Sequence, residues 1–535
     1  MPGPGPDEER KQPMTVLRTT LLAGACALGL ATGLSAETLR WGGGRDINSM
    51  DPYSFGSSYT LAFLNHVYEG LVRYDDNLQI EPALATSWEI LEDQRTWRFR
   101  LREDVRFHDG APFTAQDVMA SLTRVTHPTS PLRGNLPAYA SAEVVDDHTI
   151  DITLVGPYPL LLNDLTNIHI FNAAWLEANN AQLPTDFGAG TESYATFNAN
   201  GTGPFRAIER VPESRTVLEV FDDWWDEPQH NLTRIEFTPI TSAATRVAAL
   251  LSGEIDFTEE APVQDLARLE AAPNVVPLVT SDLRTVFFGF NQEEALADGR
   301  PNAFSDIRVR QAFGHALDLD LIHQRIMRGM SRVSGAIVAP QIPGWREDLD
   351  VPPAHDPELA RALLQEAGAE GFSFSITCAY NDYVNEEEIC NAVIPMLNRA
   401  GFDASLDIGP SAIQSQKSSN RETDVFILGW ANLPMLDSFS ILVQVLHSLE
   451  GTRGVFNWGS WSYPELDALI DAASTELDFD TRIGLQTQAL EFVRDNAILV
   501  PLHQQPMAWA ATTRVTDVTQ LGDNKARHWK TRVAE

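Results

Sequence analysis

Residues 78–125 read LQIEPALATSWEILEDQRTWRFRLREDVRFHDGAPFTAQDVMASLTRV. Within this stretch, residues 96–101 alternate large apolar with polar side chains, as a half-buried strand does. The residues FHDG at 107–110 are typical of a tight turn. Thr114 and Asp117 then form a capping box before a helix with one apolar face. A strand, a turn and an amphipathic helix in this order predict an α/β protein.

Strand-like and helical patterns alternate along the rest of the chain, which has no internal repeat and no low-complexity segment. One helix is expected between Asp356 and Gly368, and another between Glu386 and Gly401, because each ends at a glycine. The dense apolar ridge of residues 306–327 predicts a further helix. Further strands are expected at residues 38–41, 148–154, 214–220, 234–237, 286–290, 373–378 and 424–428.

The composition indicates a large acidic protein of more than one domain. The chain has 535 residues and a formal net charge of −35. This length exceeds what one hydrophobic core usually organises. The charges of residues 1–36 cancel, so the negative excess lies in the remainder. Such a field argues against nucleic acid and anionic membranes as partners.

The N-terminus has the layout of a secretory signal peptide. Arg18 precedes an apolar run over residues 21–34, and small residues follow it before Glu37. The run is shorter than the roughly 20 residues of a membrane span. We therefore predict an exported, periplasmic protein with a cleaved leader (residues 1–36), whose signal peptide begins at Met14. A signal anchor that stays attached is the alternative.

The three cysteines bear on export in two ways. Cys26 lies inside the apolar run, which continues past it, so a soluble cleaved form is favoured over a lipid anchor at this residue. Cys378 and Cys390 are 12 positions apart. In an oxidising compartment they either pair or remain two buried thiols, and the spacing leaves both outcomes open.

Signatures of secreted hydrolases and metalloenzymes are absent from the sequence. There is no G-x-S-x-G or H-E-x-x-H motif, no S-x-x-K with its companion motifs, and no His/Cys cluster with metal-ligand spacing. The run Gly42-Gly43-Gly44 lacks the neighbours of a phosphate-binding loop and indicates backbone freedom where a strand ends. We predict no catalytic site, no cofactor and no metal.

A series of short motifs runs in order along the chain. They are MDP (50–52), YEGL (68–71), PALA (82–85), Trp88, FRLR (99–102), FHDG (107–110), FT and DV (113–118), GTGPF (201–205), LLSGEID (250–256), DIRVRQAF (306–313) and GW (429–430). In combination they resemble the family 5 extracellular solute-binding proteins, the dipeptide, oligopeptide and nickel receptors of ABC importers. The resemblance extends from Glu37 to the C-terminus.

The resemblance implies an α/β, two-lobed periplasmic-binding-protein fold with an extra subdomain inserted in the first lobe. The lobes of such receptors close on the ligand. The implied division gives lobe 1 residues 37–69, 200–286 and 498–535, the inserted subdomain residues 70–199, and lobe 2 residues 287–497. The two chain crossings, near residues 287–291 and 498–503, would form the hinge.

The resemblance also implies where a ligand binds. In peptide-binding members, a Gly-Trp pair of lobe 2 is followed by an aspartate that pairs with the α-ammonium of the peptide. Here that aspartate is replaced by Asn432 or Leu433, which weakens the generic peptide interpretation. A core Trp430 and a salt-bridged surface loop at Arg45 and Asp46 are the alternatives to ligand contacts. The expected ligand-binding residues are Gly44, Arg45, Asp46, Gly429, Trp430, Ala431, Asn432 and Asp437.

Together these features predict a monomeric receptor of an ABC importer. It is expected to bind a peptide-like or other small polar solute and to pass it to an inner-membrane permease with its ATPases, without a nucleic-acid partner. Alternatives are a receptor for an opine, a sugar or a metal chelate, a sensor that signals to a chemotaxis partner, and a secreted hydrolase.

Overall fold

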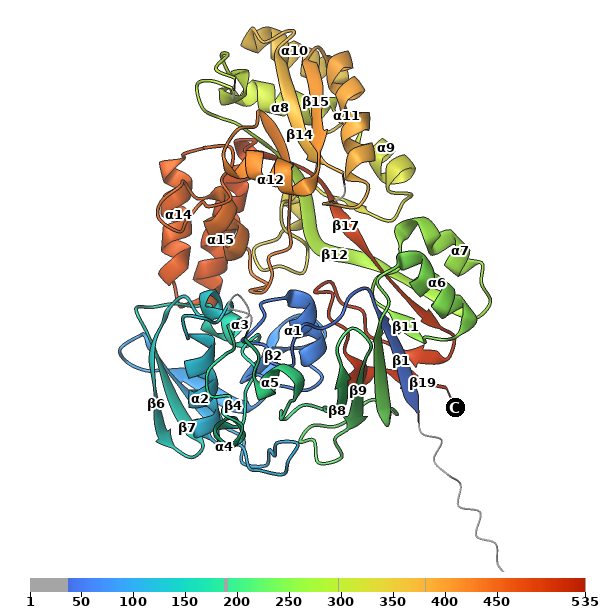
Figure 1. Ribbon diagram of the computed structural model, residues 1–535. Helices are drawn as coiled ribbons and strands as arrows, with labels where there is room; N and C mark the ends of the chain where they lie inside the picture. The colour runs from blue at the N-terminus through green and yellow to red at the C-terminus, as the bar shows by residue number, and fades with distance from the viewer. Residues whose placement is uncertain (1–36, 187–190, 297, 381, 535) are drawn as a thin grey trace, which may run out of the picture. The chain divides into compact units, whose positions relative to one another are not determined.

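The computed structural model describes residues 37–186, 191–296, 298–380 and 382–534. The predicted signal peptide and Cys26 lie outside these residues. The described chain is a mixed α/β protein, as the sequence predicts (Figure 1). Among the described residues, no helix is both long and apolar enough to span a membrane.

An eleven-stranded sheet runs through the described chain in the order β15-β14-β16-β12-β17-β11-β1-β10-β9-β8, with β13 beside β17. Its longest strands, β12 (Val275–Phe290) and β17 (Leu499–Thr512), are antiparallel neighbours. Figure 1 shows them lying side by side along the middle of the sheet. The other strands are β1 (Thr38–Gly43), β8 (Phe205–Val211), β9 (Arg215–Val220), β10 (Arg234–Pro239), β11 (Phe257–Thr258), β13 (Arg332–Val333), β14 (Ser373–Ala379), β15 (Asp403–Gly409) and β16 (Val425–Trp430).

Three smaller antiparallel sheets complete the strands of the described chain. A four-stranded sheet in the order β4-β5-β7-β6 lies within the residues predicted as an inserted subdomain. Two-stranded sheets pair β2 with β3 and β18 with β19. Their strands are β2 (Val72–Tyr74), β3 (Ile80–Pro82), β4 (Ala85–Ile90), β5 (Thr96–Leu101), β6 (Tyr139–Asp146), β7 (Thr149–Leu154), β18 (Val515–Asp517) and β19 (Arg532–Val533).

Helices connect and cover these strands. In Figure 1, α11 lies beside β14 and β15, and α14 lies beside α15. The α-helices are α1 (Ser58–Leu64), α2 (Ala115–Val125), α3 (Leu161–Leu165), α4 (Ala173–Ala178), α5 (Tyr194–Phe197), α6 (Ala243–Ser252), α7 (Leu266–Glu270), α8 (Ile307–Ala316), α9 (Leu319–Leu321), α10 (Pro357–Ala367), α11 (Glu386–Ala400), α12 (Ser411–Ser419), α13 (Phe439–Ile441), α14 (Pro464–Thr475) and α15 (Phe479–Asp495).

Most predicted elements are confirmed, and two differ in extent. The strand at 96–101 is β5, and the capping box of Thr114 and Asp117 begins α2. The apolar ridge of residues 306–327 is not one helix, because Leu317 is extended and the Asp318 side chain caps a new turn. The strand expected at 286–290 is only the end of β12, which begins at Val275.

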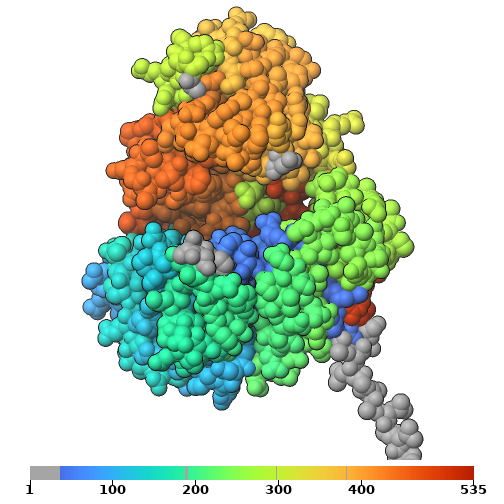
Figure 2. Space-filling view, in the orientation of Figure 1, coloured from blue at the N-terminus to red at the C-terminus, as the bar shows by residue number. Residues whose placement is uncertain are grey.

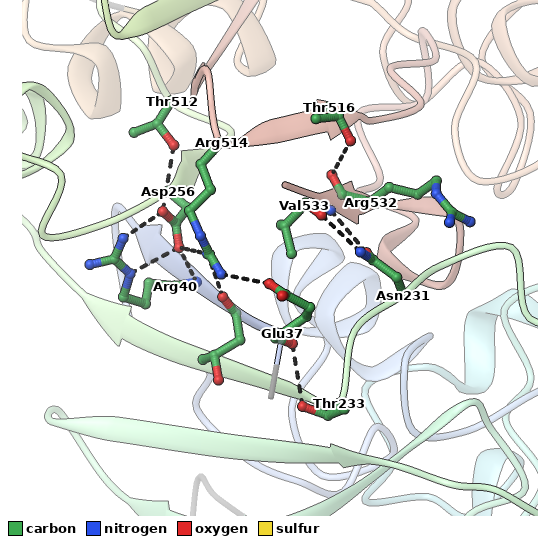
Figure 3. Close-up of polar contacts among 11 residues, drawn as sticks. Glu37, Arg40, Asn231, Thr233, Asp256, Thr512, Arg514, Thr516, Arg532 and Val533 are labelled. Carbon is green, nitrogen blue, oxygen red and sulfur yellow. Dashed lines mark hydrogen bonds and ion pairs between the residues drawn. The ribbon is translucent and has the colours of Figure 1, made fainter. Parts of the chain in front are cut away.

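Asp256, from the LLSGEID motif, ties the C-terminal segment to β1 (Figure 3). It is fully buried and accepts hydrogen bonds from Arg40 Nη2 at 2.6 Å and Nε at 2.9 Å. Arg514 Nη1 donates to it at 3.1 Å, while Arg514 Nη2 lies 3.0 Å from Glu37. This motif residue therefore has a structural role, since its carboxylate joins segments from both ends of the described chain.

Cys378 in β14 and Cys390 in α11 form a disulfide, with Cα atoms 6.7 Å apart. The sequence left this pairing open. Both side chains lie in a hydrophobic cluster with Phe374, Ile376 and Val393. The disulfide therefore joins a strand and a helix that already share a core.

Candidate ligand-binding site

A cavity of about 500 Å³ lies among segments that are far apart in sequence. Its volume is within the range of small-molecule sites in proteins. In Figure 2 the surface is hollowed where the blue residues near α1 face the orange residues of the C-terminal half. The lining comes from parts of residues 45–62, 131–167, 259–284, 433–434 and 523–525. It therefore includes residues from both sides of the β12–β17 pair.

Glycines at the end of β1 make room for two polar side chains of this cavity. A Cβ on Gly43 would lie 2.2 Å from the Tyr59 hydroxyl, and a Cβ on Gly44 would lie 1.5 Å from Glu260 Oε2. Only glycine allows such close approach. The sequence predicted only backbone freedom for the glycines at the end of this strand. In the structure, the absence of side chains at Gly43 and Gly44 leaves the space that Tyr59 and Glu260 occupy beside the cavity.

Three of the four carboxylates in the lining face a cation of this chain. Glu260 lies 3.3 Å from Arg45 Nη2 and 3.5 Å from Arg246 Nη2. Asp282 lies 4.0 Å from Arg284 Nε, and burial raises the pKa of its carboxyl. Their charges are therefore balanced, at least in part, within the protein.

Asp523 is the third of these carboxylates. It accepts hydrogen bonds from Arg527 Nη1 at 3.0 Å and Nη2 at 2.8 Å. Burial alone would raise the pKa of Asp523, but the Arg527 guanidinium outweighs burial and the pKa is lowered. Asp523 is thus a stable carboxylate that needs no further cation.

Glu259 is the fourth carboxylate, and its surroundings differ. It is 8% exposed and takes part in no ion pair within the described chain. Burial, followed by the negative charge of Glu260, raises the pKa of Glu259 to about 8. A buried carboxylate without a cation is costly, and it is commonly found at functional sites.

Arg284 and Lys525 supply positive charge to the same cavity. Arg284 Nη1 donates to the Gly429 carbonyl at 3.0 Å, and the rest of its guanidinium has only the distant Asp282 as a partner among the described residues. Lys525 Nζ donates to Asn167 Oδ1 at 3.1 Å, and burial lowers the pKa of this lysine. The cavity thus offers groups of both signs.

The predicted site residues of the first lobe divide into two groups. Arg45 lines the cavity, and Gly44 borders Glu260. Asp46 is 6% exposed, and its carboxylate accepts two hydrogen bonds from Arg210 at 2.8 and 2.9 Å. Both charged residues of this loop are therefore in salt bridges, but with other segments: Asp46 pairs with Arg210, and Arg45 pairs with Glu260.

The predicted residues in and after β16 are not among the residues that line the cavity. Leu433 and Pro434 line it, and Gly429 offers its carbonyl to Arg284. Trp430 is half-buried, donates from Nε1 to Ser440 Oγ at 3.0 Å and packs against Phe456. Ala431 is buried beside it.

Asn432 and Asp437 are both 1% exposed but differ in their bonding. Neither side-chain polar atom of Asn432 has a hydrogen-bond partner in the described part of the chain. Asp437 instead accepts from Arg482 Nη1 at 2.8 Å, Gln486 Nε2 at 2.7 Å and the Phe439 backbone N–H at 2.9 Å. The prediction that these two residues contact the ligand stays a prediction.

Sequence reasoning did not find the charged lining residues other than Arg45. Those it missed are Tyr59, Glu259, Glu260, Asp282, Arg284, Asp523 and Lys525. No motif marks them, and the chain has 74 acidic residues from which no single carboxylate stands out. The only local signal is the adjacent pair Glu259-Glu260 directly after a short strand.

Two other results concern alternative sites. A second cavity of about 230 Å³ lies among α8, residues 335–353 and α15, and its lining is mainly apolar. In the residues that the structure describes, no group of three or more His, Cys, Asp or Glu side chains could hold a metal ion.

Comparisons with known proteins agree with this fold. The model of the bacterial extracellular solute-binding proteins, family 5 Middle, matches residues 79–451. The glutathione-binding protein GsiB of Salmonella paratyphi A is 25% identical over 504 residues, which cover 92% of this chain and 94% of that protein.

Solved structures show the same fold. HbpA2 from Haemophilus parasuis has a TM-score of 0.82 at 23% identity, covering 93% of this chain and all of that one. The periplasmic binding protein DppA from Helicobacter pylori, in complex with the peptide STSA, has a TM-score of 0.69 at 24% identity, covering 93% of this chain and 98% of that one.

The family match defines the class of protein: a solute-binding receptor, and the members of this class are not enzymes. The chain belongs to the bacterial extracellular solute-binding proteins of family 5, the substrate-binding proteins of ABC importers.

Proposed function

We propose that this chain is a periplasmic receptor that binds a peptide-like solute in the cavity and delivers it to an inner-membrane ABC permease. The observation that carries this proposal is the cavity of about 500 Å³, whose lining holds both carboxylates and cations. Peptides, including glutathione, carry both signs of charge. The relatives named for glutathione and solved with a peptide support this ligand class.

Ligand binding would be coupled to closure of two lobes. We place lobe 2 at residues 287–497, so that the chain enters it through β12 and leaves it through β17. These adjacent strands pair closely, with register shifts between Ser281 and Thr285 and, at the start of the proposed lobe 2, between Val286 and Phe287. Such an irregularity at a crossing is a suitable place for a hinge. The importer would recognise the closed form, and the exported protein would act as a monomer.

Of the predicted contact residues, Arg45 and Asn432 have the best support. Arg45 is in the cavity lining, and its side chain is 65% exposed. The Asn432 side chain has two polar atoms for which the described chain provides no partner, and buried polar groups are rarely left in this state. Arg45 can therefore form a hydrogen bond to a polar ligand, and Asn432, next to Leu433 of the lining, is the second candidate.

Thermal denaturation with a ligand panel tests the proposal. The panel holds glutathione, trialanine, agropinic acid, maltose and a nickel–histidine complex. A peptide-class solute should raise the melting temperature with increasing concentration, because binding at 100 times Kd adds about 2.7 kcal/mol to stability. Stabilisation by the opine, the sugar or the chelate alone would favour those alternatives. A chain that responds to none of the five would contradict the proposal.

A further inference from the structure

The balance of charge around the cavity singles out one carboxylate. Asp282, Glu260 and Asp523 each face an arginine of this chain at 4.0 Å or less. Glu259 faces no cation in the described residues, although it is more deeply buried than Glu260. A cation that reaches this cavity from outside therefore gains most by pairing with Glu259, because no cation of the described chain is paired with that carboxylate.

The Tyr59 hydroxyl provides a second polar group at the same place. Its oxygen is buried and has no hydrogen-bond partner among the residues described. The hydroxyl borders Gly43 and Glu260 borders the next residue, Gly44, so the Tyr59 hydroxyl lies on the same wall as Glu260. The charges of Glu259, Glu260, Arg45 and Arg246 all act on Tyr59. An ammonium group has three N–H donors and can use a carboxylate and a hydroxyl oxygen together.

Arg284 is the corresponding group for an anion. It comes from β12, whereas Glu259 follows β11 and Tyr59 belongs to α1. A hydrogen bond from Nη1 to the Gly429 carbonyl, 3.0 Å long, fixes the position of its guanidinium. A fixed guanidinium with further N–H groups suits a carboxylate, which it can bind through two parallel hydrogen bonds.

We propose that Glu259 and Tyr59 bind the cationic group of a zwitterionic ligand, while Arg284 binds its carboxylate. This rests on the proposed receptor function and specifies the chemistry of the same cavity. It also accounts for the absence of an aspartate after Trp430. The partner of the ligand's cation is then a glutamate of the opposite wall, and Asn432 remains free to act as a neutral hydrogen-bonding group.

Calorimetric titration of matched ligands tests this assignment. The probes are glutathione and trialanine, each unmodified, N-acetylated or amidated at a carboxylate. Acetylation removes the cationic amine, so it should weaken binding to the unsubstituted receptor about 10- to 100-fold, as expected for a hydrogen bond to a charged group. In Glu259→Gln the same acetylation should change Kd less than twofold. Glu259→Asp, which keeps the charge, should restore the preference for the free amine.

Arg284→Gln is the corresponding variant for the carboxylate. It should remove the discrimination against the amidated probes and leave the discrimination against the acetylated ones. Glu254→Gln is the matched control, because Glu254 is exposed in the same segment and does not line the cavity. The melting temperature of each variant shows that it is folded; Glu259→Gln should be at least as stable as the unsubstituted chain.

The outcomes separate the two proposals. If neither peptide nor any other panel solute binds, the receptor function itself fails. If a peptide binds but its acetylated form binds equally well, or if Glu259→Gln keeps the preference for the free amine, the assignment of Glu259 fails and the receptor function stands. Binding of a non-zwitterionic solute alone also overturns the assignment.

Discussion

Two buried carboxylates of this chain have opposite surroundings. Asp437, in the segment after Trp430, is 1% exposed and accepts hydrogen bonds from Arg482, Gln486 and a backbone N–H. Glu259, after β11, is 8% exposed and has no ion-pair partner within the described residues. A carboxylate whose bonds are all formed inside the protein stabilises the fold. A carboxylate without a cation reduces stability and is available to a ligand.

The largest effect is expected from Asp437→Asn. The substitution leaves Arg482, whose side chain is 4% exposed, without its negative partner. Breaking such a buried pair should lower the free energy of unfolding by about 4 kcal/mol, as measured by urea denaturation. Asp298→Asn is the control, because Asp298 and Arg300 are both about half exposed, so water can solvate Arg300 once the carboxylate is lost and the stability should change little.

The same variant tests the sequence-based interpretation of Asp437. If this residue contacts the ligand, Asp437→Asn should weaken ligand binding while the stability changes little. The hydrogen bonds of its carboxylate lead us to expect the reverse result. The variant should be folded but less stable, and its Kd for the ligand, measured below its melting temperature, should be unchanged.

Asp256→Asn should have the next largest effect. Asp256 is 0% exposed, but its partners Arg40 and Arg514 have side chains that are 39% and 32% exposed. Water can therefore solvate the two cations once the carboxylate is lost, and we expect a loss of about 3 kcal/mol. Urea denaturation again provides the measurement. A loss as large as that of Asp437→Asn would show that exposure of the partners does not reduce the cost.

The contrast between Asp437 and Glu259 also shows what the sequence could and could not predict. The α/β class, the capping box of α2 and the strand β5 follow from local patterns, which act within about ten residues. The family motifs identified the receptor class. They did not identify Glu259, because its distinctive property is the absence of a cation around it, and that absence depends on segments from residue 45 to residue 525.

The sequence identified Asp437 by its distance from Trp430, and such a distance contains no information about Arg482 or Gln486. Both partners come from α15, 45 and 49 positions further along the chain. The prediction for Gly44 and Arg45 rests on a strand end and its loop, which are local features, and Arg45 lies in the cavity lining. The pairing of charges across the fold is a tertiary property, and a single sequence does not record it.

Glu259→Gln should raise stability, in contrast to the two aspartate variants. The pKa of Glu259 is about 8 in the folded chain against an ordinary value near 4.5. Between these values the folded state holds a proton that the unfolded state has released, so the stability of the unsubstituted chain falls as the pH rises through this window. Glutamine does not titrate. The variant should therefore gain stability relative to the unsubstituted chain as the pH rises from 4.5 toward 8.

Melting temperatures measured from pH 4.5 to pH 8.5 check this expectation, with Glu254→Gln as the exposed control. Equal melting temperatures of Glu259→Gln and the unsubstituted chain across the range would show that Glu259 is neutralised within the protein. The comparison with Asp437 would then no longer hold.

Glu260→Gln should have the smallest effect on stability. Glu260 is 30% exposed and lies 3.3 and 3.5 Å from Arg45 and Arg246, so we expect a change of less than about 1 kcal/mol. Its informative effect is on Glu259. The negative charge of Glu260 is the second cause of the raised pKa of Glu259, after burial. Removing that charge should lower the pKa of Glu259.

In Glu260→Gln, the fall of stability with pH should therefore begin near the same pH as in the unsubstituted chain but end at a lower one, because the unfolded state is unchanged and only the folded pKa moves. Melting temperature against pH measures both ends of this window. An unchanged upper end would mean that burial alone holds the proton on Glu259. If the fall of stability instead ends at a lower pH, the adjacent carboxylate adds to burial in keeping Glu259 protonated until a cation arrives.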